Sequence, residues 1–228
     1  MAHGDDDGLV LPPKIAPIKL VILPVLGKDD DKVLKFANDL KARLSNGQSN
    51  FTGSVEMWGD SGKFTGKTIG WKLSQSELMG IPLEITIGLK EIEQNGVVVC
   101  YRKNKNLVTG ESDTEFANVP VNLKSDDILA TVEKMLEHLQ NVLLGRHKKF
   151  TETNTHSVDS YEEFKKVMAG PKGFISAFWC ERAECELKIK NETKASTRCL
   201  PLDAKEEKGE CVGCGGEAKY RWIFAQSY

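Results

Sequence analysis

The heptapeptide Ile18-Lys19-Leu20-Val21-Ile22-Leu23-Pro24 decides which fold this sequence predicts. It is rich in β-branched and other apolar residues, and it comes early in a chain of 228 residues. A short apolar run of this kind is typical of a buried strand. Proline ends the run because it cannot donate a ladder hydrogen bond. The first regular element is therefore expected to be a core strand.

A helix is expected directly after this strand. Three aspartates, Asp29 to Asp31, stand where the negative charge favours the start of a helix. Apolar residues then recur at helical spacing and give the helix one apolar face. These residues are Val33, Phe36, Ala37, Leu40 and Leu44.

Further strands and a short helix follow in alternation. Strands are expected at 55–58, at 83–87, where apolar residues alternate with polar ones, and at 97–101. Ser74 and Glu77 have the spacing of a capping box for the short helix, which Gly80 ends. This order of elements predicts an α/β layer with a mixed, mostly parallel sheet flanked by helices.

The second half of the chain begins with the longest expected helix, which starts at 125–127. Its apolar stripe runs from Ile128 to Leu143. Residues 150–158 are polar and are expected to form a linker. Ser160 and Glu163 then have capping-box spacing for a further helix.

The charge balance limits the kinds of partner that the chain can have. Acidic and basic residues nearly cancel, giving a formal net charge of -2. Any RNA contact must therefore come from local clusters of donors rather than from a global field. No apolar stretch approaches the roughly 20 residues that span a bilayer, and the acidic N-terminus does not resemble a secretory signal. We expect an intracellular, cytoplasmic protein that binds neither membrane nor DNA.

Cysteines form the strongest local signal. Of six, five fall in the last fifty residues, and four make the pattern Cys180-x4-Cys185, then twenty-five residues, then Cys211-x2-Cys214-Gly215-Gly216. In a reducing compartment such a pattern favours a structural zinc site with four thiolate ligands and no open coordination position. Ordinary reduced thiols and a disulfide within each pair are the alternatives.

The other cysteines and the histidines offer no competing site. Cys199 lies outside both pairs and is expected to be a buried packing residue rather than a ligand. Cys100, inside a strand rich in valine, is expected in the core. The four histidines are scattered and none has ligand spacing to another.

Several segments resemble prolyl-tRNA synthetases of the archaeal and eukaryotic type. The resemblance is carried by the opening run His3 to Pro17, by Gly70-Trp71-Lys72, and by the run Glu77 to Leu83. It continues to the end of the chain through the cysteine pattern, the Thr197 to Pro201 run, and the terminal Ser227-Tyr228.

The resemblance implies a division of the chain into three parts. Residues 1–16 would be the remnant of the end of a class II catalytic domain. Residues 17–149 would form the anticodon-binding α/β domain with its long C-terminal helix, and 150–228 a small α+β zinc-binding domain. In the family the motifs that hold ATP lie upstream of this sequence, so no catalytic residue is assigned. The chain alone is expected to be inactive, and ATP would bind only to the intact parent enzyme. Intact members pair through the catalytic domain, so this chain is expected to be a monomer. In the family the terminal tyrosine lies near the active site, which implies a docking role for Tyr228.

The family's anticodon-reading pattern is altered here. Where the family has arginine, glutamate and arginine around one strand, this chain has Glu84, Thr86 and Lys90, and an aspartate–arginine pair has become Asp60-Ser61. Lysine offers a point charge in place of the planar fork of arginine.

The contacts that the sequence still offers to tRNA are of two kinds. Phosphate partners are expected at Lys90, Arg102, Lys103 and Lys105, and stacking surfaces at Trp58, Trp71 and Tyr101. Trp71 could equally be a core residue, and the run Arg102 to Lys105 could be a solvated turn.

Three functions are compatible with these features. The leading one is the C-terminal portion of a proline–tRNA ligase, which contributes binding of the anticodon of tRNA-Pro and a structural zinc domain. The second is a free-standing RNA-binding module without chemistry, and the third is a protein-interaction role.

Overall fold

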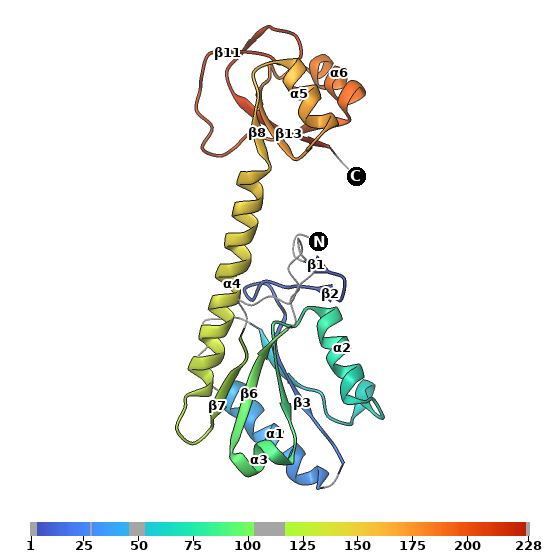
Figure 1. Cartoon of the computed structure of the whole chain (residues 1–228), viewed down its shortest axis with the longest axis vertical. Helices are drawn as coiled ribbons and strands as arrows, with labels where there is room; N and C mark the ends of the chain where they lie inside the picture. Colours follow the sequence, from blue (N-terminus) through green and yellow to red (C-terminus); the bar gives the residue numbers. More distant parts are fainter. Residues whose placement is uncertain (1–3, 28, 46–52, 103–116, 227–228) are drawn as a thin grey trace. The chain divides into compact units, whose positions relative to one another are not determined.

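The computed structural model of the chain describes residues 4–27, 29–45, 53–102 and 117–226. These residues divide into two compact units, unit 1 (Met1–Gly145) and unit 2 (Arg146–Tyr228), and the division falls within one long helix (Figure 1). Among the described residues, no helix combines the length and the apolar character that crossing a membrane requires.

Unit 1 is built on a five-stranded mixed sheet with the order β4-β3-β5-β6-β7. The expected α/β layer is confirmed. Strand β3 pairs in parallel with β4 and β5, whereas β5–β6 and β6–β7 are antiparallel. The strands are β3 (Ile18–Pro24), β4 (Ser54–Met57), β5 (Leu83–Ile87), β6 (Gly96–Tyr101) and β7 (Val119–Asn122).

Helices cover both faces of this sheet. They are α1 (Asp30–Ser45), the 3-10 turn η1 (Gly62–Phe64), α2 (Ile69–Met79), α3 (Leu89–Gln94) and α4 (Ile128–Thr153). Leu20 and Ile22 of β3 share a core with α1 and α4, and Val21 and Leu23 share a second core that α2 packs against. Strand β3 is therefore buried on both faces, which explains why its apolar run is continuous rather than alternating.

The direction of β6 follows from the short connection before it. Only residues 88–95, which contain α3, join β5 to β6. A crossover between parallel neighbours needs a dozen or more residues, so the chain turns back and β6 runs antiparallel to β5. The sheet is thus less parallel than the element order indicated.

Three local expectations differ from the structure. Helix α2 begins at Ile69, because the Thr68 hydroxyl accepts a hydrogen bond from Trp71 N (3.2 Å) and acts as N-cap in place of Ser74. Gly80 ends this helix in the left-handed conformation, as predicted.

Residues 150–158 are not a linker, since α4 continues to Thr153 and strand β8 (Thr155–Ser157) follows directly. Strand β7 had no counterpart in the prediction.

Residues 4–16, which we call the N-terminal strap, precede β3. The short strands β1 (Gly4–Asp5) and β2 (Gly8–Leu9) pair with each other, and β2 contacts α2. Figure 1 shows the strap beside the end of the sheet where β3 begins and β6 ends. Within unit 1 the strap therefore belongs to the same compact body as the sheet.

After the end of α4, the described part of unit 2 contains a four-stranded sheet, two further helices and a small hairpin. The sheet has the order β10-β13-β9-β8, so the last strand of the chain lies between two earlier ones. Helix α5 is capped by Ser160, whose hydroxyl accepts from Glu163 N (3.2 Å), as predicted. The remaining elements are α5 (Tyr161–Ala169), β9 (Phe174–Phe178), α6 (Ala183–Thr193), β10 (Ala195–Cys199), β11 (Gly209–Glu210), β12 (Glu217–Ala218) and β13 (Arg221–Gln226).

Candidate metal centre and nucleic-acid interface

Four cysteine sulfurs converge in unit 2. The Sγ atoms of Cys180, Cys185, Cys211 and Cys214 all lie within 4.8 Å of one another. Cys180 Sγ is 3.4 Å from Cys185 Sγ and 3.8 Å from Cys214 Sγ. The structure thus brings together the four residues that the sequence spacing selected.

The first pair is positioned by the connection between β9 and α6. Cys180 follows β9, and the next residue, Glu181, takes a left-handed conformation (φ 60) that turns the chain. Cys185 lies in the first turn of α6, where its backbone N donates to Arg182 O (3.2 Å). This tight turn directs both sulfurs toward the same point.

The second pair lies on the turn between β11 and β12. Cys211 N donates to Gly216 O (2.7 Å), and Gly215 N donates to Cys211 O (2.7 Å). Gly215 has a φ of 70, a conformation that glycine adopts without strain. Val212 N donates to Phe178 O (2.9 Å), so this turn is fastened to the end of β9 beside Cys180.

The surroundings of the sulfurs favour a bound cation. Cys185 and Cys211 are 8% and 2% exposed, and burial raises the pKa of both thiols. The backbone N–H of Gly216 and the neighbouring Cys185 lower the pKa of Cys214 to about 7. A buried thiolate needs a compensating positive charge, and a divalent ion between the sulfurs would supply it.

The spacing of the sulfurs also fits a tetrahedral metal. Zinc–sulfur bonds of about 2.3 Å put the sulfurs of a tetrahedron about 3.8 Å apart. A disulfide would require about 2.05 Å, and all six cysteines are free thiols here. The four sulfurs can therefore hold one ion and leave it no open position.

Two other cysteines behave differently from the sequence expectation. Cys199, predicted to be buried, is exposed at the end of β10, and Cys100 is only half-buried. Both belong to strands in which alternate side chains point away from the core. Neither is a member of the four-sulfur cluster.

A lysine that the sequence analysis did not single out supports the cluster. Lys188 Nζ donates to Gly213 O (2.9 Å), which lies between the second pair of cysteines. Its position one helical turn after Cys185 on α6 is the sequence signal that could have identified it.

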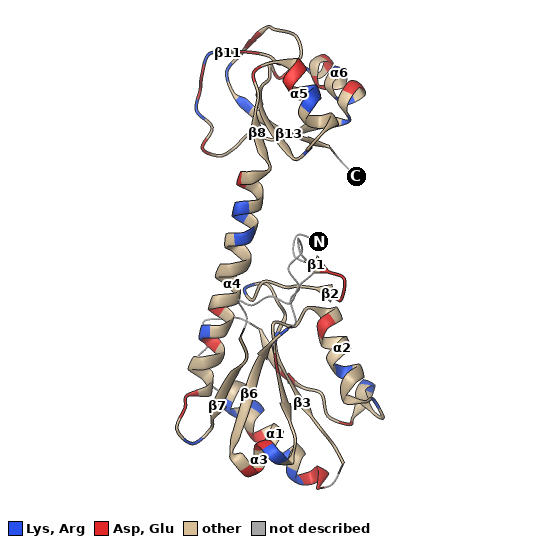
Figure 2. Ribbon diagram, viewed as in Figure 1, with Lys and Arg blue, Asp and Glu red and all other residues tan. Residues whose placement is uncertain are grey.

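Two of the residues expected to contact tRNA are exposed on unit 1. Trp71, in the first turn of α2, is 38% exposed, and Lys67 Nζ lies 5.0 Å from the centroid of its ring. Lys90 is exposed in the first turn of α3. Figure 2 shows basic residues near the N-terminal end of α2, whereas acidic and basic residues are interleaved along α1.

Lysines beside aromatic rings form a local pattern between Lys63 and Trp71 that was not predicted from the sequence. Lys63 Nζ lies 4.9 Å from the centroid of the Phe64 ring, just upstream of the Lys67–Trp71 contact. Basic and aromatic residues interleaved in this way are typical of surfaces that bind single-stranded nucleic acid. The alternation from Lys63 to Trp71 was visible in the sequence.

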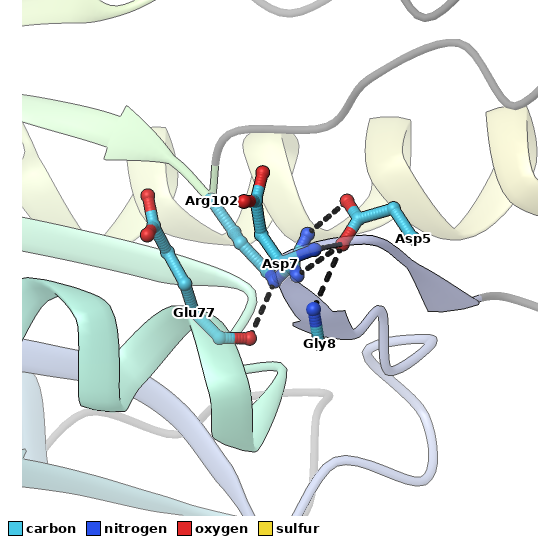
Figure 3. Close-up of polar contacts among 5 residues, drawn as sticks. All are labelled: Asp5, Asp7, Gly8, Glu77 and Arg102. Carbon is cyan, nitrogen blue, oxygen red and sulfur yellow. Dashed lines mark hydrogen bonds and ion pairs between the residues drawn. The ribbon is translucent and has the colours of Figure 1, made fainter.

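Arg102 is placed differently from the expectation. It is 5% exposed, and its guanidinium forms a two-pronged ion pair with Asp5, at 2.7 and 2.8 Å (Figure 3). Its Nε donates to Glu77 O (2.9 Å). This guanidinium is buried and bonded to Asp5 and Glu77 inside unit 1, so we no longer expect it to contact phosphate. Lys103, Lys105 and Tyr228 lie outside the described residues.

Trp58 and Tyr101 are core residues rather than stacking surfaces. Trp58 is 1% exposed, stacks on Phe64 with ring centroids 4.7 Å apart, and donates from Nε1 to Glu56 (2.8 Å). Tyr101 is 8% exposed and lies beside His138. Trp71 is therefore the exposed member of the three aromatics.

The altered residue Glu84 on β5 and the retained Asp60 before η1 have internal partners. Glu84 is half-buried and accepts from the Ser76 hydroxyl (3.2 Å) on α2. Asp60 accepts from Gly66 N (2.6 Å), which shapes the turn around η1. Both carboxylates thus have structural roles beside α2.

Comparison with known proteins identifies two regions of the chain. Residues 19–119 match the family model "Anticodon binding domain", and residues 161–228 match the model "Prolyl-tRNA synthetase, C-terminal". The two matches correspond to unit 1 and unit 2 in order along the sequence.

Curated and solved relatives match over the whole chain. Proline–tRNA ligase 2 of Bacillus thuringiensis (strain Al Hakam) is 35% identical over 228 residues, and the proline–tRNA ligase of Ruminiclostridium cellulolyticum is 36% identical. The crystal structure of prolyl-tRNA synthetase from Cryptosporidium parvum superposes with a TM-score of 0.76 at 28% identity and covers 100% of this chain. The chain spans 43% of the length of each of these relatives.

Proposed function

Because this chain carries the anticodon-binding domain and the C-terminal domain of a prolyl-tRNA synthetase, we propose that it serves as the tRNA-binding portion of a proline–tRNA ligase. In this role unit 1 binds the anticodon region of tRNA-Pro, and unit 2 is a domain stabilised by zinc. The observation that carries the proposal is the match to relatives along the entire chain, with both domains in the family's order. Attachment of proline at the expense of ATP would belong to the complete enzyme.

Zinc is the metal that the chemistry of the cluster supports best. Four thiolates select zinc, copper(I) or iron over the oxygen-preferring ions. Zinc adds no redox chemistry and accepts a closed tetrahedron, which suits a structural role. We therefore assign one structural Zn²⁺ per chain to Cys180, Cys185, Cys211 and Cys214. A cysteine cluster binds metal rather than forming disulfides in a reducing compartment, which supports a cytoplasmic location.

The tRNA surface that we propose comprises the N-terminal end of α2 and Lys90 on α3. Trp71 offers its ring to an unstacked anticodon base, and Lys67, together with Lys90, offers positive charge to phosphate. Lys103, from the sequence analysis, stays a further expected phosphate contact. The near-neutral net charge means that these few donors must supply the electrostatic attraction.

Replacing Trp71 by alanine is expected to weaken binding of tRNA-Pro roughly tenfold or more, because one stacked base contributes about 1–3 kcal/mol. The measurement is filter binding or fluorescence anisotropy with labelled tRNA-Pro at two salt concentrations. The salt slope should stay as in the unmodified chain, since no phosphate contact is removed.

A matched control separates stacking from charge. Lys90→Ala should reduce the salt slope as well as the affinity, because it removes one phosphate partner. Equal binding by the unmodified chain and by Trp71→Ala would remove this residue from the interface. Undetectable binding by the unmodified chain at low salt would reject the proposed tRNA role and favour a protein-interaction module.

A free-standing RNA-binding module is the second candidate. Glu84, Thr86 and Lys90 replace the residues that the family places around β5, which favours relaxed recognition. The same binding measurement distinguishes the two functions. A preference for tRNA-Pro over other tRNAs supports the ligase, and equal affinities support the module.

A further inference from the structure

The N-terminal strap is fastened to unit 1 by buried cations. The Asp5 carboxylate receives two hydrogen bonds from Arg102 and two more from the backbone N of Asp7 (3.0 Å) and Gly8 (3.1 Å) (Figure 3). Both side chains of the ion pair are at most 4% exposed. A buried guanidinium paired in this two-pronged geometry fixes both position and orientation.

The other end of the strap is held at two more points. Lys14 N donates to the Gln140 side chain of α4 (3.0 Å). Lys19, which is 4% exposed, donates from Nζ to Ala16 O (2.5 Å) and to Pro13 O. The strap is therefore attached to α4 and β3 as well as to Arg102, which directly follows β6.

The strap packs against the C-terminal end of α2 with no spare space. A Cβ on Gly8, which has a φ of 139, would lie 2.5 Å from Leu78 Cα. A Cβ on Gly80, which has a φ of 71, would lie 2.7 Å from Leu9 O. Glycine at both positions lets the strap touch the backbone of the last turn of α2.

Helix α2 has an unusual attachment to its sheet because its two buried residues are polar. Lys72 Nζ donates to Gly59 O (3.0 Å), and Ser76 shares a hydrogen bond with Glu84. Its apolar residues Ile69, Leu73 and Met79 are only half-buried. A helix that buries so little apolar surface depends more than usual on polar contacts such as the one from Arg102 to Glu77 O.

We propose that Asp5 and Arg102 are positioning residues, whose ion pair holds the strap and the C-terminal turn of α2 together. The pair thereby fixes the N-terminal end of the helix, where Trp71 lies in the first turn and Lys67 directly before the N-cap. The expected effect on tRNA binding rests on the proposed function. The expected effect on the order of α2 does not, because it concerns the helix alone. Helix α2 has 11 residues and buries little apolar surface, so releasing its C-terminal turn loosens the whole helix and misplaces the Trp71 ring.

The test is Asp5→Asn, which keeps the shape of the side chain and removes its charge. We expect faster hydrogen exchange of the backbone amides of Trp71 and Lys72, which donate to Thr68, and a roughly threefold to tenfold loss of affinity for tRNA-Pro. Asp6→Asn is the matched control, since Asp6 is exposed and carries the same charge one residue away. It should leave both the exchange and the affinity as in the unmodified chain.

A double-mutant cycle shows whether the effect travels through Trp71. If the ion pair acts by placing this ring, Asp5→Asn should cost little further affinity in a Trp71→Ala background. Arg102→Lys is a second variant for the case in which Asp5→Asn folds poorly. It keeps the positive charge without the planar fork, so exchange and affinity should change in the same direction but by a smaller amount.

Each outcome decides the inference. Unchanged exchange in the first turn of α2 despite release of the strap would overturn it, and so would losses that add independently of Trp71. A gain in affinity would also overturn it, because it would show that the strap competes with tRNA for Arg102. Faster exchange in a chain that binds no tRNA would support the positioning role and reject the proposed function separately.

Discussion

Replacing Cys180 by serine is expected to abolish stoichiometric metal binding and to leave unit 2 without a cooperative unfolding transition. Cys180 Sγ is near both Cys185 and Cys214, so its loss disrupts both halves of the tetrahedron. Structural zinc contributes about 10–16 kcal/mol of binding free energy to small domains that it stabilises. A domain stability of about 5–15 kcal/mol cannot absorb the loss of a large part of that contribution. Metal analysis and near-ultraviolet circular dichroism during heating would measure both effects.

Cys199→Ser provides the matched control for this experiment. Cys199 is exposed, belongs to the same unit, and lies outside the four-sulfur cluster. This variant should keep one zinc per chain and an unchanged melting transition. Protein purified without chelator that holds no metal, yet melts cooperatively, would contradict the assignment of a structural zinc site.

Trp58→Ala is expected to lower the free energy of unfolding of unit 1 by about 3–5 kcal/mol, the range for truncating a large buried aromatic side chain. The indole is 1% exposed, stacks on Phe64 and lies in the core that α2 packs against. Truncation leaves a cavity there and leaves Glu56 without its indole partner. Urea unfolding followed by the circular dichroism of unit 1 measures the change.

The companion variant is Trp71→Ala, which removes the same side chain from an exposed position. Its effect on stability should stay within about 0.5 kcal/mol, as for most surface substitutions. The two tryptophans thus separate stability from binding, since Trp58→Ala acts on folding and Trp71→Ala on tRNA affinity. Similar losses of stability from both variants would show that the core and surface roles have been assigned incorrectly.

Local patterns in the sequence predicted the parts of the fold that depend on neighbouring residues. The apolar run of β3, the helical stripe of α1 and the Ser160 cap are set by short-range periodicity and hydrogen bonding. The cysteine cluster was predictable because each pair occupies one tight turn, and such spacing directs two sulfurs to one ion.

Long-range contacts account for what the sequence did not predict. Arg102 is followed by Lys103, Asn104 and Lys105 and is expected on the surface from this local pattern, but its partner Asp5 lies 97 residues earlier in the sequence. The start of α2 is a different case, because the Thr68 hydroxyl that caps it accepts from Trp71 N, only three residues further on. Threonine at this position was a local N-cap signal that the prediction missed in favour of Ser74.

The position of β13 between β9 and β10 has a consequence for how unit 2 is made. This strand is synthesised after β9 and β10, yet it pairs with both of them and carries Phe224 into the core. During translation β9 and β10 therefore have unpaired edges until β13 emerges from the ribosome. A premature stop codon just before β13 would remove the centre of the sheet rather than trim its border, and a nascent chain stalled there would be a natural target for chaperones and proteases.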